Sequence, residues 1–297
     1  MPTRRIKLAV LLALLVATRV SAQSTPTPAP APAAAPKPAP AAPNAASLAI
    51  PPDAEHAKEA LANSPRHGEW VDVKLPDGKK VVTWVVYPEK KEKAGVVIVI
   101  HEIFGLSDWV RGVADTFARE GFIAVAPDLL SGMGPNGGGT DSLGEDATKV
   151  IRTLTPEAVA TRLDAVRAYA LGLPAANGKV GSVGFCWGGA ASFNYAAAQP
   201  KLDAAVVFYG TSPSDPAAYA KITAPVLGHY GGDDERVDAT IPAAEEAMKK
   251  LGKSYTAKIY AGAGHGFLRQ LSGRDGANLK ASQEAWPATV AFFRKQL

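Results

Sequence analysis

The chain has 297 residues, more than a usual single domain, and its formal net charge of +4 equals the four basic residues of its first 22 positions. Without that segment, 28 basic residues face 28 acidic ones, which gives no support to a nucleic-acid-binding or membrane-surface protein. The only cysteine is Cys186, which excludes an internal disulfide and, without a His/Cys cluster, argues against a zinc site.

The first 52 residues have the composition of a targeting segment followed by a tether. Residues 1–22 combine a basic start, an apolar run at 8–17 and the small-residue sequence Val-Ser-Ala at 20–22, which predicts a secretory signal peptide. The apolar run is too short to span a membrane. Residues 23–52 are almost wholly Ala, Pro, Thr and Ser, which predicts a disordered tether. We therefore expect an exported protein, periplasmic or secreted, without a membrane span after cleavage.

The remaining residues, 53–297, predict one α/β domain with a mostly parallel central sheet and helices on both faces, because short apolar runs alternate with amphipathic stretches. Two period-two runs predict a hairpin around Pro-Asp-Gly at 76–78. A Gly- and Pro-rich stretch at 131–144 predicts a mobile loop near the site. The predicted strands are 70–75, 80–87, 96–100, 122–125, 180–185, 202–209, 224–230 and 254–260. The predicted helices are 108–120, 156–171, 188–198, 241–251 and 279–296.

The stretch at 180–189 organises the domain. A buried strand ends at the sequence Gly184-Phe-Cys-Trp-Gly188, which is the nucleophile elbow G-x-S-x-G with cysteine in the serine position. The glycines fit a sharp turn where strand and helix cross, and the helix N-terminus points at the thiol. Cys186 is therefore a candidate nucleophile, and the alternative is a buried structural cysteine.

Two further polar segments follow predicted strands, Gly-Gly-Asp-Asp at 231–234 and Gly-His-Gly-Phe at 264–267. The order nucleophile, acid, histidine is that of α/β-hydrolases, and functional groups of such sheets gather beyond the strands' carboxyl ends. His265 would act as the base, and either Asp233 or Asp234 would orient its ring. A solvated loop histidine is the alternative for His265.

An oxyanion needs two backbone donors. One is the N–H of Trp187, and the other should come from the segment His-Glu-Ile-Phe-Gly at 101–105, after the central strand. Glu102 in that segment is unusual for a plain hydrolase, and pairing with a surface arginine is its alternative role.

Together these four segments resemble the dienelactone hydrolase (carboxymethylenebutenolidase) family of the α/β-hydrolase superfamily, over about residues 71–293. The resemblance implies a triad of Cys186, His265 and Asp234, because the family pattern Gly-Gly-x-Asp selects the second aspartate. It also implies that Glu102 receives the thiol proton when substrate binds. The other residues expected at the site are Ile103 and Trp187 as oxyanion donors, with Arg269, Tyr209, Phe104 and Arg152 as substrate contacts.

The chain departs from the family pattern in three ways. Members that open dienelactone supply a second arginine from the segment at 131–146, which here has none; the nearest is Arg152. His101 stands where glutamine is common. The exported address differs from the cytosolic role familiar for the family.

The sequence thus predicts an exported cysteine hydrolase of a carboxylic ester or lactone with an acidic substituent, acting through an acyl-enzyme. A thiolate leaves more easily than an alkoxide, so it suits substrates with a stabilised leaving group such as an enolate. We expect a monomer with a small-molecule substrate, no nucleic-acid partner, no metal and no cofactor. The alternatives are a broad-specificity exported esterase or peptidase on the same scaffold and a non-catalytic envelope binding module.

Overall fold

The computed structural model of the chain describes residues 50–297. The predicted signal peptide and most of the predicted tether therefore lie outside the described residues. Ile50 is 5% exposed and packs against the hydrophobic cluster that contains helix α2 (Asp108–Arg119). The packed part of the chain thus begins by residue 50, within the range expected as tether. No helix of the described residues is long and apolar enough to cross a membrane.

Strand β3 (Ala94–Ile100) shows why this chain folds in layers. It is buried along its whole length, and its side chains alternate between two hydrophobic clusters. Ile98 and Ile100 belong to the first cluster, and Val97 and Val99 to the second. A strand that is apolar on both faces requires a covering layer on each side of the sheet.

Within residues 50–297, eight strands form one sheet in the order β1-β2-β4-β3-β5-β6-β7-β8. The strands β1 and β2 form the predicted antiparallel hairpin around residues 76–78, β2 also runs antiparallel to β4, and the other neighbours are parallel. The predicted mostly parallel sheet is therefore confirmed. The strands are β1 (Gly68–Lys74), β2 (Lys80–Val86), β4 (Ile123–Pro127), β5 (Ala176–Phe185), β6 (Ala204–Phe208), β7 (Val226–Gly231) and β8 (Tyr255–Tyr260).

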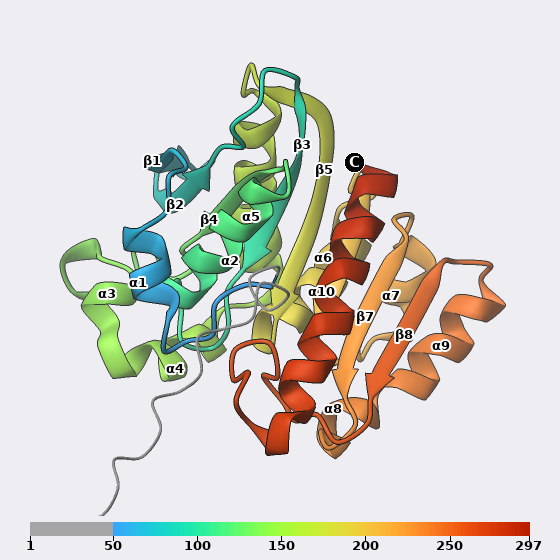
Figure 1. Cartoon of the computed structure of the whole chain (residues 1–297). Coiled ribbons are helices and arrows are strands. Elements are labelled where there is room, and N and C mark those ends of the chain that lie inside the picture. The colour runs from blue at the N-terminus through green and yellow to red at the C-terminus, as the bar shows by residue number, and fades with distance from the viewer. Residues whose placement is uncertain (1–49) are drawn as a thin grey trace, which may run out of the picture. The chain divides into compact units, whose positions relative to one another are not determined.

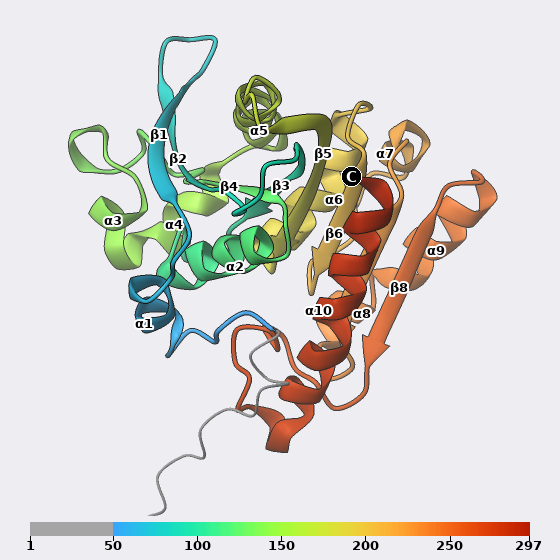
Figure 2. The ribbon, with the colours of Figure 1, turned by 45° about the horizontal axis from the view of Figure 1, so that its top comes forward.

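Helices cover both faces, and α10 crosses the sheet on the side that faces the viewer in Figure 1, with a second view in Figure 2. The first cluster packs α5 (Pro156–Leu171), α6 (Trp187–Ala198), α7 (Pro216–Lys221) and α9 (Ile241–Lys250) on the sheet. The second cluster packs α1 (Ala57–Ala62), α2 and α10 (Ala277–Gln296). The remaining helical turns are η2 (Pro135–Gly137), α3 (Thr140–Leu143), η3 (Gly144–Asp146), α4 (Ala147–Val150), η4 (Ile151–Thr153), α8 (Glu235–Asp238) and η5 (Arg274–Gly276).

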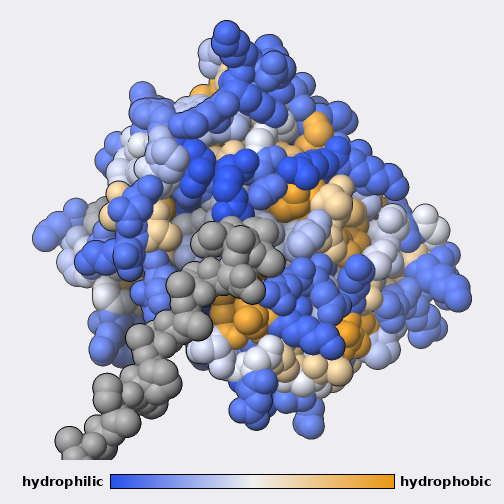
Figure 3. All heavy atoms as spheres, in the orientation of Figure 1, coloured by the Kyte–Doolittle hydropathy of each residue, from blue (hydrophilic) through white to orange (hydrophobic). Residues whose placement is uncertain are grey.

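The five predicted helices are confirmed to within two residues at each end. Helix α5 begins where expected because Thr155 caps it, its hydroxyl accepting the N–H of Ala158, and Pro156 stands at the first helical position. The side of the molecule seen in Figure 3 is mostly hydrophilic, with apolar residues in scattered spots, as expected where α2 and α10 turn their polar faces outward.

The stretch at 131–144 is irregular but contains short helical turns, and its mobility stays a prediction. It contains η2 and ends in α3. The Asp128 carboxylate, directly after β4, accepts hydrogen bonds from the N–H of Thr140 at 2.8 Å and from its hydroxyl at 2.7 Å. The same hydroxyl accepts the N–H of Leu106 at 3.0 Å. Hydrogen bonds therefore hold Asp128 and Thr140 together, a pairing called the clasp below. Through Leu106 they also connect this stretch to the segment that follows β3.

Candidate active site

Cys186 occupies the turn between β5 and α6 with φ of +56°, a conformation that side-chain-bearing residues rarely adopt. Its N–H donates to the carbonyl of Phe208 on β6 at 3.0 Å, which anchors the turn to the sheet. A methyl group at Gly184 would collide with the Gly188 backbone, and one at Gly188 with the carbonyls of Ile100 and His101. Both glycines of the elbow are therefore sterically required, and the half-buried thiol is held where strand and helix cross.

The thiol faces the two expected oxyanion donors. The backbone N–H groups of Trp187 and Ile103 are directed at the sulfur and act to lower its pKa. Burial, together with the nearby Glu102 carboxyl, has the larger effect and raises the pKa of Cys186 above its ordinary value of 9.0. Within residues 50–297 the thiol makes no hydrogen bond to His265. The raised pKa favours the neutral thiol in the resting protein.

His265 and Asp234 form a direct pair between the loops that follow β8 and β7. The ring Nδ1 lies 2.5 Å from the Asp234 carboxylate, whose side chain is 8% exposed. Asp233 instead forms an exposed ion pair with Arg274 at 3.0 Å. Of the two aspartates that the residues alone left open, the structure therefore brings Asp234 to the histidine. The strands β7 and β8 are neighbours in the sheet, which explains how residues 31 apart in sequence meet.

Glu102 is a buried carboxyl beside the thiol, with a side chain that is 4% exposed. Burial raises its pKa to about 7, and the positive charge of Arg269 opposes this. The Arg269 Nε lies 3.2 Å from a Glu102 oxygen that accepts no hydrogen bond of good geometry from the described residues. The two charges are therefore close, but the N–H of Arg269 does not point at the oxygen. The guanidinium also lies 4.8 Å over the ring of Phe104. The ionic neighbour of Arg269 is therefore the buried carboxyl group of Glu102.

One cavity of about 630 Å³ is lined by the expected residues Cys186, His265, Glu102, Ile103, Phe104, Trp187, Tyr209, Arg152 and Arg269. Tyr209 is fully buried, has φ of +40°, and places its ring 5.2 Å from that of His265. Among residues 50–297 its hydroxyl has no hydrogen-bond partner, and burial raises its pKa well above the ordinary value. The Tyr209 hydroxyl is thus a buried donor next to the His265 ring. Arg152 is exposed, and its Nε donates to the Thr148 carbonyl at 3.1 Å.

Three polar cavity residues, Arg236, Thr211 and Gln270, escaped the sequence reasoning. Arg236 lies in α8, two residues beyond Asp234, and its charge acts to lower the pKa of the Cys186 thiol. Its place shortly after β7 was the available signal, since the same segment supplies Asp234. Thr211 follows β6 in the same way, at the carboxyl end of a parallel strand.

Comparisons with known proteins identify the family. The dienelactone hydrolase family matches residues 81–297. A "putative carboxymethylenebutenolidase" of Saccharolobus solfataricus is 33% identical over 250 residues, which cover 74% of this chain and 95% of the relative. The chain belongs to the dienelactone hydrolase family. It is therefore a hydrolase of the carboxymethylenebutenolidase type, acting on carboxylic ester bonds, and the predicted family and enzyme class are confirmed.

Two solved structures share the fold. A dienelactone hydrolase-like promiscuous phosphotriesterase from metagenomic libraries is 26% identical with a TM-score of 0.66, covering 78% of this chain and 98% of the other. A dienelactone hydrolase from Anabaena variabilis is 25% identical with a TM-score of 0.57, covering 75% of this chain and 96% of the other. The α/β-hydrolase fold of this dienelactone hydrolase family member is thus confirmed.

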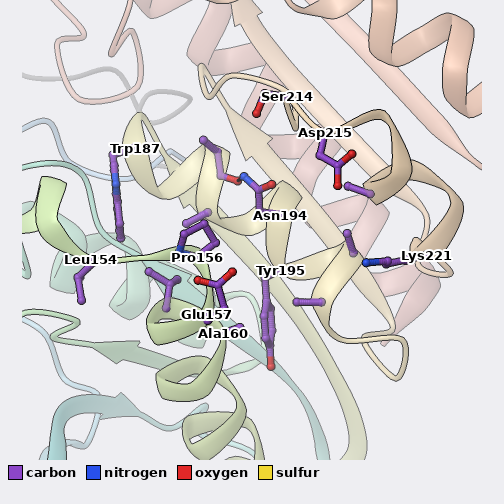
Figure 4. A pocket seen from close by; sticks show the side chains of 16 residues that line it. Leu154, Pro156, Glu157, Ala160, Trp187, Asn194, Tyr195, Ser214, Asp215 and Lys221 are labelled. Carbon is purple, nitrogen blue, oxygen red and sulfur yellow. Dashed lines mark hydrogen bonds between the residues drawn. The ribbon is translucent and has the colours of Figure 1, made fainter.

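A second hollow of about 470 Å³ lies on α6 between α5 and α7, and Figure 4 shows it with Trp187 at one end and Lys221 at the other. It shares Trp187 and Ala190 with the cavity around the thiol. It contains neither the cysteine, the histidine nor the buried acid of this dienelactone hydrolase family member. We therefore assign the candidate active site to the first cavity, with Trp187 as the boundary between the two.

Proposed function

We propose that this enzyme is an exported cysteine hydrolase that cleaves a carboxylic ester or lactone bearing an acidic group, with Cys186 as nucleophile. One observation carries the proposal: a single cavity holds the Cys186 thiol on a strained turn, beside the paired His265 and two N–H groups directed at the sulfur. A nucleophile, a base and oxyanion donors are what acyl transfer requires. Export rests on the signal-like pattern of residues 1–22.

The charges of the cavity support an acidic substrate. Its lining carries three arginines, Arg152, Arg236 and Arg269, and one carboxyl, Glu102. This excess of positive charge attracts an anion. An incoming carboxylate binds Arg269 by charge-assisted hydrogen bonds and competes with Glu102 for it. Glu102, whose pKa is about 7, is then free to accept the thiol proton when substrate is present.

The reaction proceeds by acylation and hydrolysis. Cys186 transfers its proton to Glu102, and the thiolate attacks the carbonyl carbon while the oxyanion accepts the N–H groups of Ile103 and Trp187. The C–O bond breaks as the C–S bond is retained, and the leaving oxygen takes up the proton that left the thiol. His265 next accepts a proton from water, the resulting hydroxide attacks the thioester, the C–S bond breaks, and the proton returns from His265 to sulfur.

The chemistry of sulfur favours lactones and esters with good leaving groups. In the first tetrahedral intermediate a thiolate is expelled in preference to a simple alkoxide, which returns the substrate unchanged. An enolate or phenolate leaves readily enough to compete. A panel of aryl esters, enol lactones and alkyl esters, each in neutral and acidic forms, therefore ranks the candidate substrates, and equal rates on neutral and acidic forms would favour a broad-specificity esterase.

The test of the nucleophile is Cys186→Ala in the mature chain. We expect the variant to fold and to lose essentially all hydrolysis of the preferred ester, and we expect the parent to form an adduct of acyl-group mass on Cys186 in a rapid-quench mass spectrum. Activity of the alanine variant within about tenfold of the parent would refute the assignment, because removing a triad nucleophile costs far more.

The test of substrate-dependent thiol activation uses succinate as a small acidic probe and iodoacetamide as the alkylating reagent. We expect succinate to speed alkylation of Cys186 in the parent and to leave it unchanged in Glu102→Gln, which cannot accept the proton. An equal response in both proteins, or none in the parent, would return Glu102 to a structural role.

A further inference from the structure

His101 is a fully buried imidazole at the end of β3, directly before the segment that carries Glu102 and Ile103. Its Nε2 lies 3.1 Å from the backbone nitrogen of Leu129, which has a hydrogen to donate. Nε2 must therefore be the unprotonated nitrogen, and the ring hydrogen resides on Nδ1. Burial lowers the pKa of His101, which keeps the ring neutral even though the Asp128 charge opposes this.

The protonated Nδ1 donates to the backbone carbonyl of Glu102 at 2.8 Å. That carbonyl also accepts the N–H of Gly105 at 3.2 Å, which closes the turn. The carbonyl of Glu102 and the N–H of Ile103 belong to one planar trans peptide group, so they point in opposite directions. Holding the carbonyl therefore sets the direction of the Ile103 N–H, and a bond to the oxygen also polarises that N–H.

The imidazole of His101 also contacts Trp187, the residue that carries the second backbone donor. The imidazole of His101 stacks on the indole of Trp187, with centroids 5.9 Å apart and planes inclined by 16°. The backbone N–H of Trp187 is the second group directed at the sulfur. One side chain thus contacts both residues whose amides face Cys186, one through a hydrogen bond and one through ring packing.

We propose that His101 is a positioning residue that aims the N–H groups of Ile103 and Trp187 at the reacting carbonyl oxygen. The inference deepens the proposed function and rests on it, because an oxyanion forms only if Cys186 attacks a carbonyl. His101 does not line the cavity around the thiol, so it acts through the two residues it orients. A rigid ring with a fixed tautomer reaches Leu129 on one side and Glu102 on the other.

The matched variants are His101→Gln, which keeps a donor and an acceptor, and His101→Leu, which keeps neither. We expect His101→Leu to lower kcat by about 10–10²-fold, somewhat less than deleting a donor outright, and His101→Gln to stay within about fivefold of the parent. Alkylation by iodoacetamide builds no oxyanion. Its plateau rate at alkaline pH should therefore stay within about threefold of the parent in both variants.

His229→Leu is the control. This histidine is also fully buried and also contacts two polar groups, the hydroxyls of Tyr260 at 2.9 Å and Thr289 at 3.0 Å, but it lies on β7 away from the oxyanion donors. We expect its replacement to lower the melting temperature without a selective loss of kcat. A merely structural role for His101 predicts the same behaviour for both histidines.

Nitrogen-15 NMR of histidine-labelled parent protein tests the inference without a mutation, in case His101→Leu does not fold. We expect His101 to carry its hydrogen on Nδ1. Hydrogen on Nε2, parental kcat in folded His101→Leu, or a His101→Gln variant as slow as the leucine variant would each overturn the inference. Hydrolysis that survives Cys186→Ala would instead remove the proposed function, so the two failures are distinguishable.

Discussion

Two buried carboxyl groups lie at the candidate active site, and they differ in their interaction partners. Asp234 is hydrogen-bonded to His265 at 2.5 Å. A Glu102 oxygen lies 3.2 Å from the Arg269 Nε, yet it has no hydrogen bond within the part of the chain that the structure describes, and burial raises the pKa of Glu102 to about 7. A buried acid with a committed partner serves to fix geometry, whereas one with an uncommitted oxygen can exchange a proton near neutral pH. The different interaction partners of Asp234 and Glu102 thus suit them to different roles, one structural and one in proton transfer.

The largest effect on turnover should come from replacing Asp234. Asp234→Asn should lower kcat by about 10²–10⁴-fold, because the amide no longer holds the correct histidine tautomer or stabilises the imidazolium. The matched control is Asp233→Asn, which only breaks an exposed ion pair with Arg274 and should stay within about threefold of the parent. Steady-state kinetics on the preferred ester decide the ranking, and the reverse order would overturn the comparison.

The raised pKa of Glu102 should make the free energy of unfolding depend on pH. Folding raises the pKa of Glu102 from 4.5 to about 7, so between those values the folded protein binds more protons than the unfolded chain. Stability is therefore lost as pH rises through this window, by about 3 kcal/mol in total, and Glu102→Gln should remove that loss. Urea unfolding of both proteins at pH 5 and pH 8 measures it. Other groups titrate alike in both and cancel in the difference. A constant difference between the two pH values would contradict the raised pKa.

Arg269→Ala should weaken the use of acidic substrates by about 1.5–3 kcal/mol in kcat/KM and leave neutral esters little changed, because it removes a charge-assisted contact to the substrate acid. Arg274→Ala is the control from the same loop region, since its guanidinium pairs with exposed Asp233. A loss of equal size on neutral and acidic esters would show that Arg269 serves only to hold Glu102.

Arg236→Ala should have the smallest effect. Iodoacetate is an anion and iodoacetamide is not, so the ratio of their alkylation rates reads the electrostatic guidance of an acid to Cys186. We expect that ratio to fall about two- to fivefold, as suits one exposed charge. Arg294→Ala is the control, because Arg294 pairs with Glu120 at 2.9 Å and does not line the cavity. An unchanged ratio in Arg236→Ala would exclude this arginine from substrate guidance.

The sequence predicts the scaffold well because its signals are local. The β-branched run of β3, the Pro-Asp-Gly hairpin and the glycines around Cys186 each determine structure within a few residues. Helix α7, with six residues, is too short to show an apolar period, and so is α8 with four. Their absence from the sequence-based prediction follows from their length.

What the sequence misses depends on distant partners. The segment at 131–144 is fastened by two hydrogen bonds from Thr140 to the Asp128 carboxylate, 12 residues away. No local sequence pattern encodes this contact. The tautomer of His101 is set by the N–H of Leu129, 28 residues away. The orientation of Arg236 into the cavity follows from how α8 packs after β7. Motifs identify which residue types are present, and tertiary contacts decide what each one faces.

The clasp between Asp128 and Thr140 has a practical consequence for redesign. Because both ends of the chain between these residues are tied to the scaffold, the eleven positions at 129–139 form a closed insert whose tip, at 134–138, can be replaced by longer or differently charged sequences. The elbow and the paired histidine would be left in place. A replaced tip would therefore change this surface segment, which does not line the cavity around Cys186, and would leave the cavity's own residues unchanged.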